Sequence, residues 1–476
     1  MKKIISVLLV SLFIVSCTDI NNMNTDPNSS YTTVPSTVVS YAQKGLSDYV
    51  NTPNVNENNF RLTMQYWQET TYADESNYDF VSRNISNNVW RDEYVVVLNN
   101  FNQAKNLIIA YSPSASEAPA WPVTMKNQLA IIDMQMIYVY QTLVDTYGNI
   151  PYSVSVDLAH NQLPTYDDAS TIYTQMITRL QTDITNLDAS GSSFSSGEYF
   201  YKGDIPSWKK FGNSLLLKLG ITIADSNAAL AQSTVNAAIS GGVFTSPADN
   251  CQFPYLSTSP NYNPIYANVI ASGRHDYVAG KTIIDEMTTA SDPRIGIFFD
   301  KVGGTYVGGT IGNPSAFASF SNVGALTKTA NFPGTVLSYT EVAFYLAEAA
   351  ARWNTGTAAA AYATAVQASF SEWGAGDATA YVTAHPYNQG TWKQSIGNEA
   401  WVAMYNQPIT SWTFYRRLDY PQLVAPSTAI ANASGKVPVR LTYPVNESTT
   451  NPTNWKAAST AIGGDLLTTK LFWDKF

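Results

Sequence analysis

Two stretches of the sequence combine flat aromatic rings with amide or guanidinium side chains. A sugar ring has an apolar C–H face and a rim of hydroxyl groups, so a site for it needs an aromatic platform with polar groups at its edge. The first stretch supplies the candidates Trp67, Tyr72, Tyr78, Arg83 and Trp90. The second stretch, from Pro254 to Tyr306, supplies Tyr262, Asn263, Tyr266, Tyr277 and Tyr306. Together these residues are the predicted ligand-binding set.

A structural role competes with the binding role at some of these positions. Trp90, Tyr94 and Leu98 follow one another at intervals of four, which is also the spacing of a helix face turned toward the core. For Trp67 the sequence leaves a platform and a core position open. The tyrosines of the second stretch are predicted as a group, since the pattern does not single out one ring.

Catalytic motifs are missing from the sequence. His160, His275 and His385 are far apart, and none has a metal-ligand spacing. Neither a Gly-x-Ser-x-Gly elbow nor a phosphate loop occurs. A carboxylate pair for glycoside hydrolysis would need a separation of about 5 to 10 Å, which a sequence does not reveal. We therefore predict a binding protein that is not an enzyme, and a surface glycosidase is the alternative from another functional class.

The composition narrows the class of ligand. The net charge is −9, and only 13% of residues are charged, against about a quarter in ordinary soluble domains. No basic run occurs, which argues against nucleic acid as the partner. Such a surface favours neutral polar ligands. Loops rich in Asp and Asn leave structural calcium open, but they lack the EF-hand spacing, and we predict no metal and no other cofactor.

Periodic apolar residues indicate that helices position the candidates. The segments 128–147, 167–187 and 207–224 have helical spacing, and polar residues inside the first favour a buried helix over a membrane span. Ser338 and Glu341 have the form of a capping box at the start of a further helix, with 357–373 as its packing partner. Between 241 and 335 glycine and proline are frequent, and helical spacing is confined to the part around 281–287.

Helix order predicts a mainly α fold, a tetratricopeptide-like helical-repeat scaffold with little β structure. The repeat consensus is not visible, so the prediction depends on the succession of helices alone. We expect one domain over residues 38–476, with helical repeats in 38–240, a loop-rich excursion in 241–335, and further helices and C-terminal loops in 336–476. Long ordered loops on a rigid scaffold are common binding sites, so the excursion is the predicted ligand face.

The N-terminus has the pattern of a secretory leader. Two lysines precede an apolar run from Ile4 to Val15, which is shorter than the roughly 20 residues of a membrane span. The end of the run, Phe13 to Cys17, resembles a bacterial lipobox, which predicts removal of 1–16, lipidation of Cys17 and a tether over 17–37. An ordinary signal peptide with a chance cysteine is the alternative. Cys251 then has no partner and is predicted to be a small buried side chain.

Several segments, taken in order, resemble the SusD/RagB lipoproteins of Bacteroidetes, and specifically the SusD-like, starch-binding-associated branch. The matching segments are Asn24–Asn28, Asp145–Tyr152, Trp208–Leu219, Asp292–Arg294, Tyr339–Ala350, Tyr415–Arg417, Val437–Arg440 and Tyr443–Pro444. In the second of these, Asn149 stands where the family usually has Asp. The resemblance covers nearly the whole chain.

The resemblance implies a helical scaffold with a ligand face built from loops. It also implies a partner, because such proteins cover a SusC-like TonB-dependent outer-membrane transporter and pass glycans, or in some members peptides, to it. An acidic residue soon after the lipidated cysteine, here Asp19, resembles the surface-export signal of this group. We therefore expect a lipid-anchored outer-membrane protein that faces the cell exterior, while a periplasmic orientation and an oligopeptide ligand remain alternatives.

Overall fold

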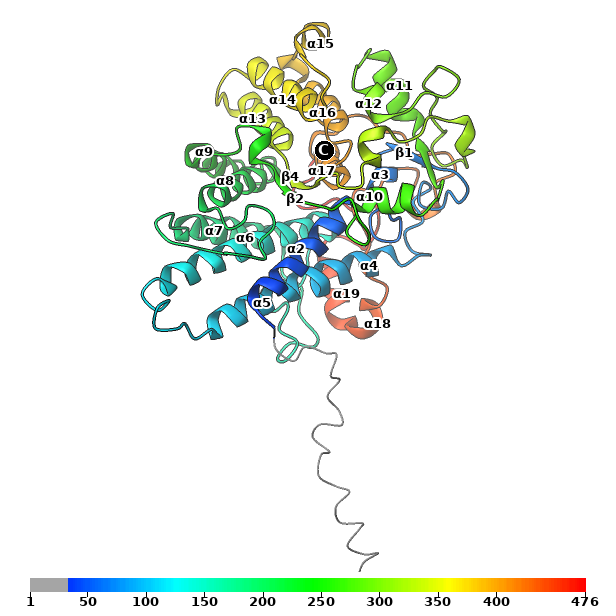
Figure 1. Ribbon diagram of the computed structural model, residues 1–476. Coiled ribbons are helices and arrows are strands. Elements are labelled where there is room, and N and C mark those ends of the chain that lie inside the picture. Colours follow the sequence, from blue (N-terminus) through cyan, green and yellow to red (C-terminus); the bar gives the residue numbers. More distant parts are fainter. Residues whose placement is uncertain (1–32) are drawn as a thin grey trace, which may run out of the picture.

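The computed structural model describes residues 33–476 and is mainly helical (Figure 1). The longer helices are α2 (Pro35–Asn51), α5 (Asn99–Ala110), α6 (Trp121–Tyr147), α7 (Ala169–Asn186), α8 (Ile205–Thr222), α9 (Ala228–Gly241), α13 (Tyr339–Trp353), α14 (Ala358–Glu372), α16 (Trp392–Ala403), α17 (Pro408–Leu418) and α19 (Pro452–Ala461). The shorter ones are α3 (Phe60–Thr63), α4 (Ile85–Arg91), α10 (Pro264–Tyr266), α11 (Lys281–Thr289), α12 (Ile295–Phe298), α15 (Thr379–Ala384) and α18 (Glu447–Thr450). Two π-helical segments, η1 (Asp92–Leu98) and η3 (Ala267–Ala271), extend α4 and α10.

Consecutive helices pack against each other in pairs. Contacts join α5 to α6, α6 to α7, α7 to α8 and α8 to α9, and the series continues through α13 with α14 and α16 with α17. Helix α13 also contacts α8 and α16, which links the two halves of the series. Figure 1 shows α6 to α9 stacked beside one another, with α13, α14 and α16 beyond them. The predicted mainly α, tetratricopeptide-like scaffold with little β structure is confirmed.

Side-chain caps fix the predicted helix starts. Asp168 accepts a hydrogen bond from the backbone N–H of Thr171 at the start of α7, and Ser338 accepts one from the N–H of Glu341 at the start of α13. The second half of the predicted capping box differs. The Glu341 carboxylate lies 2.9 Å from Nζ of Lys218 on α8, and both side chains are almost fully buried. The Glu341 side chain therefore joins α13 to α8 and does not cap the start of α13.

The segment around Gly148 ends α6. Gly148 has a φ of +89°, a conformation that favours glycine, and its N–H donates to the carbonyl of Val144. One turn earlier, the buried Asp145 accepts hydrogen bonds from the hydroxyl of Tyr173 and from Nε1 of Trp473. This segment is therefore structural, and it joins α6 to α7 and to the C-terminus.

The two neighbouring arginines of α17 have different roles. Arg417 pairs with Glu348 on α13 at 2.7 Å, with both side chains buried, and so bridges two helices. The guanidinium of Arg416 donates instead to the backbone carbonyls of Asp145 and Val439. A guanidinium has five N–H donors, so carbonyls can satisfy it as well as a carboxylate can.

Two short antiparallel sheets connect parts that are distant in sequence. Strand β2 (Cys251–Phe253) pairs with β4 (Gly334–Leu337), and the lone Cys251 is buried in it as predicted. Strand β1 (Trp67–Glu69) pairs with β3 (Tyr277–Ala279), and Glu69 lies opposite Tyr277. The second sheet joins the two predicted ligand-binding stretches. The sequence predicted no strand at 67–69, and for 241–335 it predicted ordered loops that allow a short hairpin; the strands found there pair with distant segments instead.

Gly280, just after β3, should be intolerant of a side chain. A Cβ there would lie 2.3 Å from the carbonyl oxygen of Gln65, just before β1. We predict that Gly280→Ala lowers the free energy of unfolding by about 1–3 kcal/mol, because the two backbones must move apart. Chemical denaturation would measure it. The control is Gly390→Ala, where the nearest atom is a side-chain oxygen at 3.3 Å; equal stability of both variants would contradict the prediction.

Candidate functional site

Helix α2 and the loop after it form one wall of a groove. Lys44, Asp48 and Thr52 follow one another at intervals of four, so they line the same helix face. The facing wall is the segment Pro260–Arg274, and the pocket between the walls has a volume of about 390 Å³. Tyr262 borders it from this second wall.

A second pocket of about 150 Å³ continues the first. Asn54, Asn268 and Arg274 border both pockets. Glu69 of β1 and Tyr277 of β3 also line the second one, and so do Tyr72 and Arg83 from the loop after β1. We call the two pockets together the α2 groove. The β1–β3 sheet therefore brings both predicted stretches to one place.

The cations of the α2 groove are paired within the protein. Nζ of Lys44 lies 2.5 Å from Asp48, and Nε of Arg274 lies 3.2 Å from Asp276. Arg83 forms an ion pair with the buried Glu75. Glu57, which also borders the groove, forms no ion pair with the described residues, and burial raises its pKa. The groove therefore offers no free cation to an anionic ligand and suits an uncharged one.

Aromatic and amide groups are available for such a ligand. The ring of Tyr72 is 70% exposed, so its face is open to a partner. Tyr262 is half-buried and packs edge-to-face against Tyr266, with ring centroids 5.0 Å apart. Oδ1 of Asn268 is buried and meets no hydrogen-bond donor in residues 33–476. Asn268 therefore places an unpaired acceptor at the junction of the two pockets.

Two buried carboxyl groups, those of Glu69 and Glu75, lie beneath the loop that carries Tyr72. Burial and the neighbouring carboxyl group of Glu75 raise the pKa of Glu69 to about 8. Glu69 accepts hydrogen bonds from the N–H and the hydroxyl of Ser76, and Glu75 forms an ion pair with Arg83. Both carboxyl groups therefore hold the loop in place.

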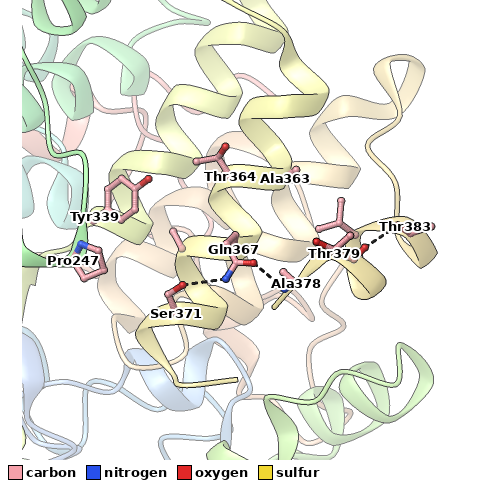
Figure 2. Close-up of a pocket in the computed structure, with 11 residues that line it drawn as sticks. Pro247, Tyr339, Ala363, Thr364, Gln367, Ser371, Ala378, Thr379 and Thr383 are labelled. Carbon is pink, nitrogen blue, oxygen red and sulfur yellow. Dashed lines mark hydrogen bonds between the residues drawn. The ribbon is translucent and has the colours of Figure 1, made fainter. Parts of the chain in front are cut away.

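A larger pocket of about 560 Å³ lies between α14 and α15, away from all predicted residues (Figure 2). Figure 2 shows Gln367 at its centre, where the amide donates to Ser371 and accepts from the N–H of Ala378. Its amide is therefore already occupied. The wall offers small side chains and the ring of Tyr339, without a second aromatic ring facing it. We therefore place the candidate site in the α2 groove.

The three histidines make separate local contacts. His160 pairs with Asp157, His275 packs against Phe317 with ring centroids 4.1 Å apart, and Nε2 of His385 lies 2.9 Å from the carbonyl of Ala290. Within residues 33–476 no three His, Cys, Asp or Glu side chains are grouped so as to hold a metal ion. The histidines therefore do not gather into one centre.

Comparisons with known proteins agree with this architecture. The model of the SusD-like family, described as starch-binding and associating with the outer membrane, matches residues 27–444. The chain belongs to the SusD-like family. A search of curated proteins found no match.

Solved structures of SusD homologues superpose over almost the whole SusD-like chain. A chitin-binding protein shares 28% identity with a TM-score of 0.80 over 93% of this chain and 100% of its own. A SusD homologue from Bacteroides vulgatus shares 22% identity with a TM-score of 0.79 over 92% of this chain and 97% of its own. A chitin-binding SusD homologue from Flavobacterium johnsoniae shares 22% identity with a TM-score of 0.77 over 92% and 98%. At 22% identity, the last two structures show a shared fold and nothing about a shared ligand.

The α2 groove gathers about half of the predicted ligand-binding residues. Tyr72, Arg83, Tyr262 and Tyr277 border it, and Tyr266 packs against Tyr262. Tyr277 is 6% exposed and its hydroxyl donates to the carbonyl of Pro53, so it contributes a wall and not an open ring face.

Three predicted residues lie in the core, which corrects the expectation that they face a ligand. Trp67 is 1% exposed, and its Nε1 donates to the hydroxyl of Tyr405. Tyr78 is fully buried against Phe80. Asn263 is also fully buried, and its Oδ1 accepts from the N–H of Ile265 to cap α10. Trp67 and Tyr78 therefore pack in the core, and Asn263 fixes the backbone at the start of α10.

Trp90 and Tyr306 lie outside the groove. Trp90 is half-buried among Tyr94, Tyr147, Tyr166 and Tyr443, and it borders a separate pocket of about 350 Å³. This position fits the core-facing role that the spacing of Trp90, Tyr94 and Leu98 also allowed. Tyr306 is half-buried, with Nζ of Lys301 5.2 Å from its ring centre. Neither residue borders the α2 groove.

Several residues of the α2 groove were not predicted from the sequence. Lys44, Asp48, Asn54, Asn268 and Arg274 are isolated polar residues in a helix face or in loops, with no motif around them. A weak signal did exist, since the run 51–59 is rich in asparagine and contains Pro53, which is typical of a loop with functional amides.

The predictions for the N-terminus fall mainly on residues that the structure does not describe. The leader 1–16, Cys17 and most of the predicted tether 17–37 lie outside residues 33–476. Helix α2 begins at Pro35, inside the predicted tether. None of the helices in the described part of the chain is both long and apolar enough to cross a membrane.

The raised pKa of Glu69 predicts a pH dependence of stability. The pKa rises from about 4.3 in an unfolded chain to about 8 in the fold, so protonated Glu69 stabilises the fold fully below about pH 4.3, and this contribution is lost as the pH approaches 8. We expect the unfolding free energy of the wild type to fall more between about pH 5 and pH 8 than that of Glu69→Gln, which has no proton to lose.

Denaturant titrations at both pH values would measure this difference. The matched control is Asp285→Asn, at an exposed carboxylate that pairs with Lys281 on the surface. Its pH dependence should equal that of the wild type. An equal fall of the unfolding free energy with pH in the wild type and in Glu69→Gln would contradict the stabilising role of protonated Glu69.

Proposed function

We propose that the protein is a non-catalytic, cell-surface lipoprotein that captures neutral glycans in the α2 groove and delivers them to a TonB-dependent outer-membrane transporter. One observation carries the binding part of this proposal. The groove presents the open ring of Tyr72, the ring of Tyr262 and the amide of Asn268, whose Oδ1 is unpaired among the described residues, while the cations of the groove are paired internally. Those groups complement the apolar face and the hydroxyl rim of a sugar.

Chitin oligosaccharides are the first ligands to test. The chitin-binding protein is 28% identical over 93% of this chain. N-acetylglucosamine is uncharged, and its acetamide N–H can donate to an acceptor such as Oδ1 of Asn268. The family description supports starch-type glucans as the second class to test.

Anchoring and delivery are supported by the sequence and the family. The lipobox-like segment ending at Cys17 would hold the chain at a membrane. The family associates with the outer membrane, and its known members work with a SusC-like transporter. A lipid anchor would keep a filled groove close to that transporter, so capture would feed import without bond cleavage.

Binding should depend on the two exposed rings. We expect Tyr72→Ala and Tyr262→Ala each to weaken binding of the glycan by about three- to ten-fold, the size of one aromatic contact. Isothermal titration calorimetry with chitin and starch oligosaccharides would measure the affinities, with a peptide panel alongside for the alternative ligand class.

The matched control is Tyr111→Ala. Tyr111 is 41% exposed and packs against Trp121, away from the α2 groove, so its removal should leave glycan affinity unchanged. Unchanged affinity in both Tyr72→Ala and Tyr262→Ala would refute the groove as the binding site. Binding of peptides without any glycan would favour the peptide receptor.

Incubation with polysaccharides tests the absence of catalysis. We expect the purified protein to release no reducing sugar from chitin, starch or plant glycans above the level of a protein-free blank. Glu69 and Glu75 are bonded to Ser76 and Arg83 in the groove wall, so Glu69→Gln should give the same baseline. Sustained release by the wild type, lost in a carboxylate variant, would establish a glycosidase.

A further inference from the structure

A third pocket, of about 330 Å³, continues the α2 groove toward the start of helix α2. Lys44 borders it as well as the first pocket of the groove. Thr37, Tyr41, Lys44 and Asp48 follow one another at intervals of four, three and four, so a single face of α2 runs along both pockets. The floor of the groove is therefore continuous along the helix.

This third pocket is rich in exposed apolar side chains. Tyr41 is 58% exposed, Tyr199 46% and Leu256 52%, and they come from three separate segments of the chain. Contiguous exposed apolar groups of this kind mark binding surfaces more often than single exposed residues do. We call this pocket the tyrosine subsite.

Tyr199 of the tyrosine subsite is held in place by contacts with buried residues. The N–H of Tyr199 donates to Oε1 of the fully buried Gln43, whose amide donates to Gln135 and Glu198. The ring of Tyr199 also packs against Phe253, with centroids 5.4 Å apart. A ring fixed before binding loses little entropy when it meets a ligand.

The polar groups of the subsite match those of the α2 groove. Its only charged lining residue among the described side chains is Lys44, which is paired with Asp48. Thr37, Ser40 and Asn261 add hydroxyl and amide groups. Both places therefore offer aromatic rings with neutral polar edges, which is the chemistry that recognises an uncharged sugar.

The loop from Leu256 to Asn261 lies between the two places. It is closed by a hydrogen bond of 2.8 Å from the N–H of Leu256 to the carbonyl of Asn261. Leu256 and Asn261 border the tyrosine subsite, whereas Pro260 borders the groove. A ligand that occupies both places would therefore have to extend past this loop and Lys44.

We propose that the tyrosine subsite binds a distant part of the same glycan chain that occupies the α2 groove. This inference depends on the proposed function. From Thr37 to Thr52 the helix face is about 22 Å long, at about 1.5 Å per residue, which exceeds a monosaccharide or disaccharide. The ligand class is therefore an extended, uncharged oligosaccharide or polysaccharide, and short sugars occupy only part of the surface.

Affinity as a function of chain length tests the proposal. Calorimetry would compare the disaccharide and the hexasaccharide of chitin, and the same lengths of maltose-type glucan. We expect the hexasaccharide to bind the wild type more tightly than the disaccharide. Tyr41→Ala and Tyr199→Ala should each weaken hexasaccharide binding by about three- to ten-fold and leave disaccharide binding unchanged, while Tyr72→Ala should weaken both.

The possible results separate this inference from the proposed function. Tyr41 and Tyr199 are exposed, so their removal should not affect folding, and Tyr111→Ala is again the matched control. If Tyr72→Ala weakens both lengths while Tyr41→Ala and Tyr199→Ala change neither, the tyrosine subsite is refuted and the α2 groove stands. Equal losses for both lengths in the Tyr41 and Tyr199 variants would also overturn it. If no oligosaccharide binds, the proposed function fails and the subsite fails with it.

Discussion

The pairing of strands β1 and β3 is the constraint on which the site depends. Each strand is three residues long, yet together they join segments that are about 200 positions apart. The N–H of Thr70 extends the pairing by donating to the carbonyl of Asp276, and Gly280 allows the closest approach of the two backbones. Without this pairing, Tyr72 and Tyr277 would belong to unrelated loops. The binding surface is therefore a product of tertiary structure and not of either segment alone.

The helical scaffold supplies the rigid wall opposite these loops. Helix α2 turns Gln43, Leu46 and Val50 inward, where they are buried, and it turns Tyr41 toward the tyrosine subsite and Lys44 and Asp48 toward the α2 groove. Internal pairing of the cations then sets the character of the surface. A cation with its own carboxylate gains little from an anionic ligand, so aromatic faces and amides decide what binds.

The sequence predicted the scaffold well because long helices carry their own signals. The apolar spacing over 167–187 and 207–224 placed α7 and α8 within a few residues, and the caps Asp168 and Ser338 were visible. The three-residue strands were missed, because they are too short to show an alternating pattern.

The site could be predicted only in part. An aromatic residue looks the same in a sequence whether its ring is open, as in Tyr72, or buried, as in Trp67 and Tyr78. What separates them is the pairing of β1 with β3 and the packing of Tyr405 against Trp67. Asn268 carried no local signal, because its role comes from lying between two pockets. The third pocket also escaped, since Tyr41 and Tyr199 come together only in the fold.

A crystal structure of the protein with a chitin or maltose-type hexasaccharide would test the central claim most directly. We predict a sugar chain along α2, with a sugar face against Tyr72 or Tyr262 and a ligand donor at Oδ1 of Asn268. A sugar chain bound between α14 and α15, or beside Trp90, with the α2 groove free of ligand, would contradict it.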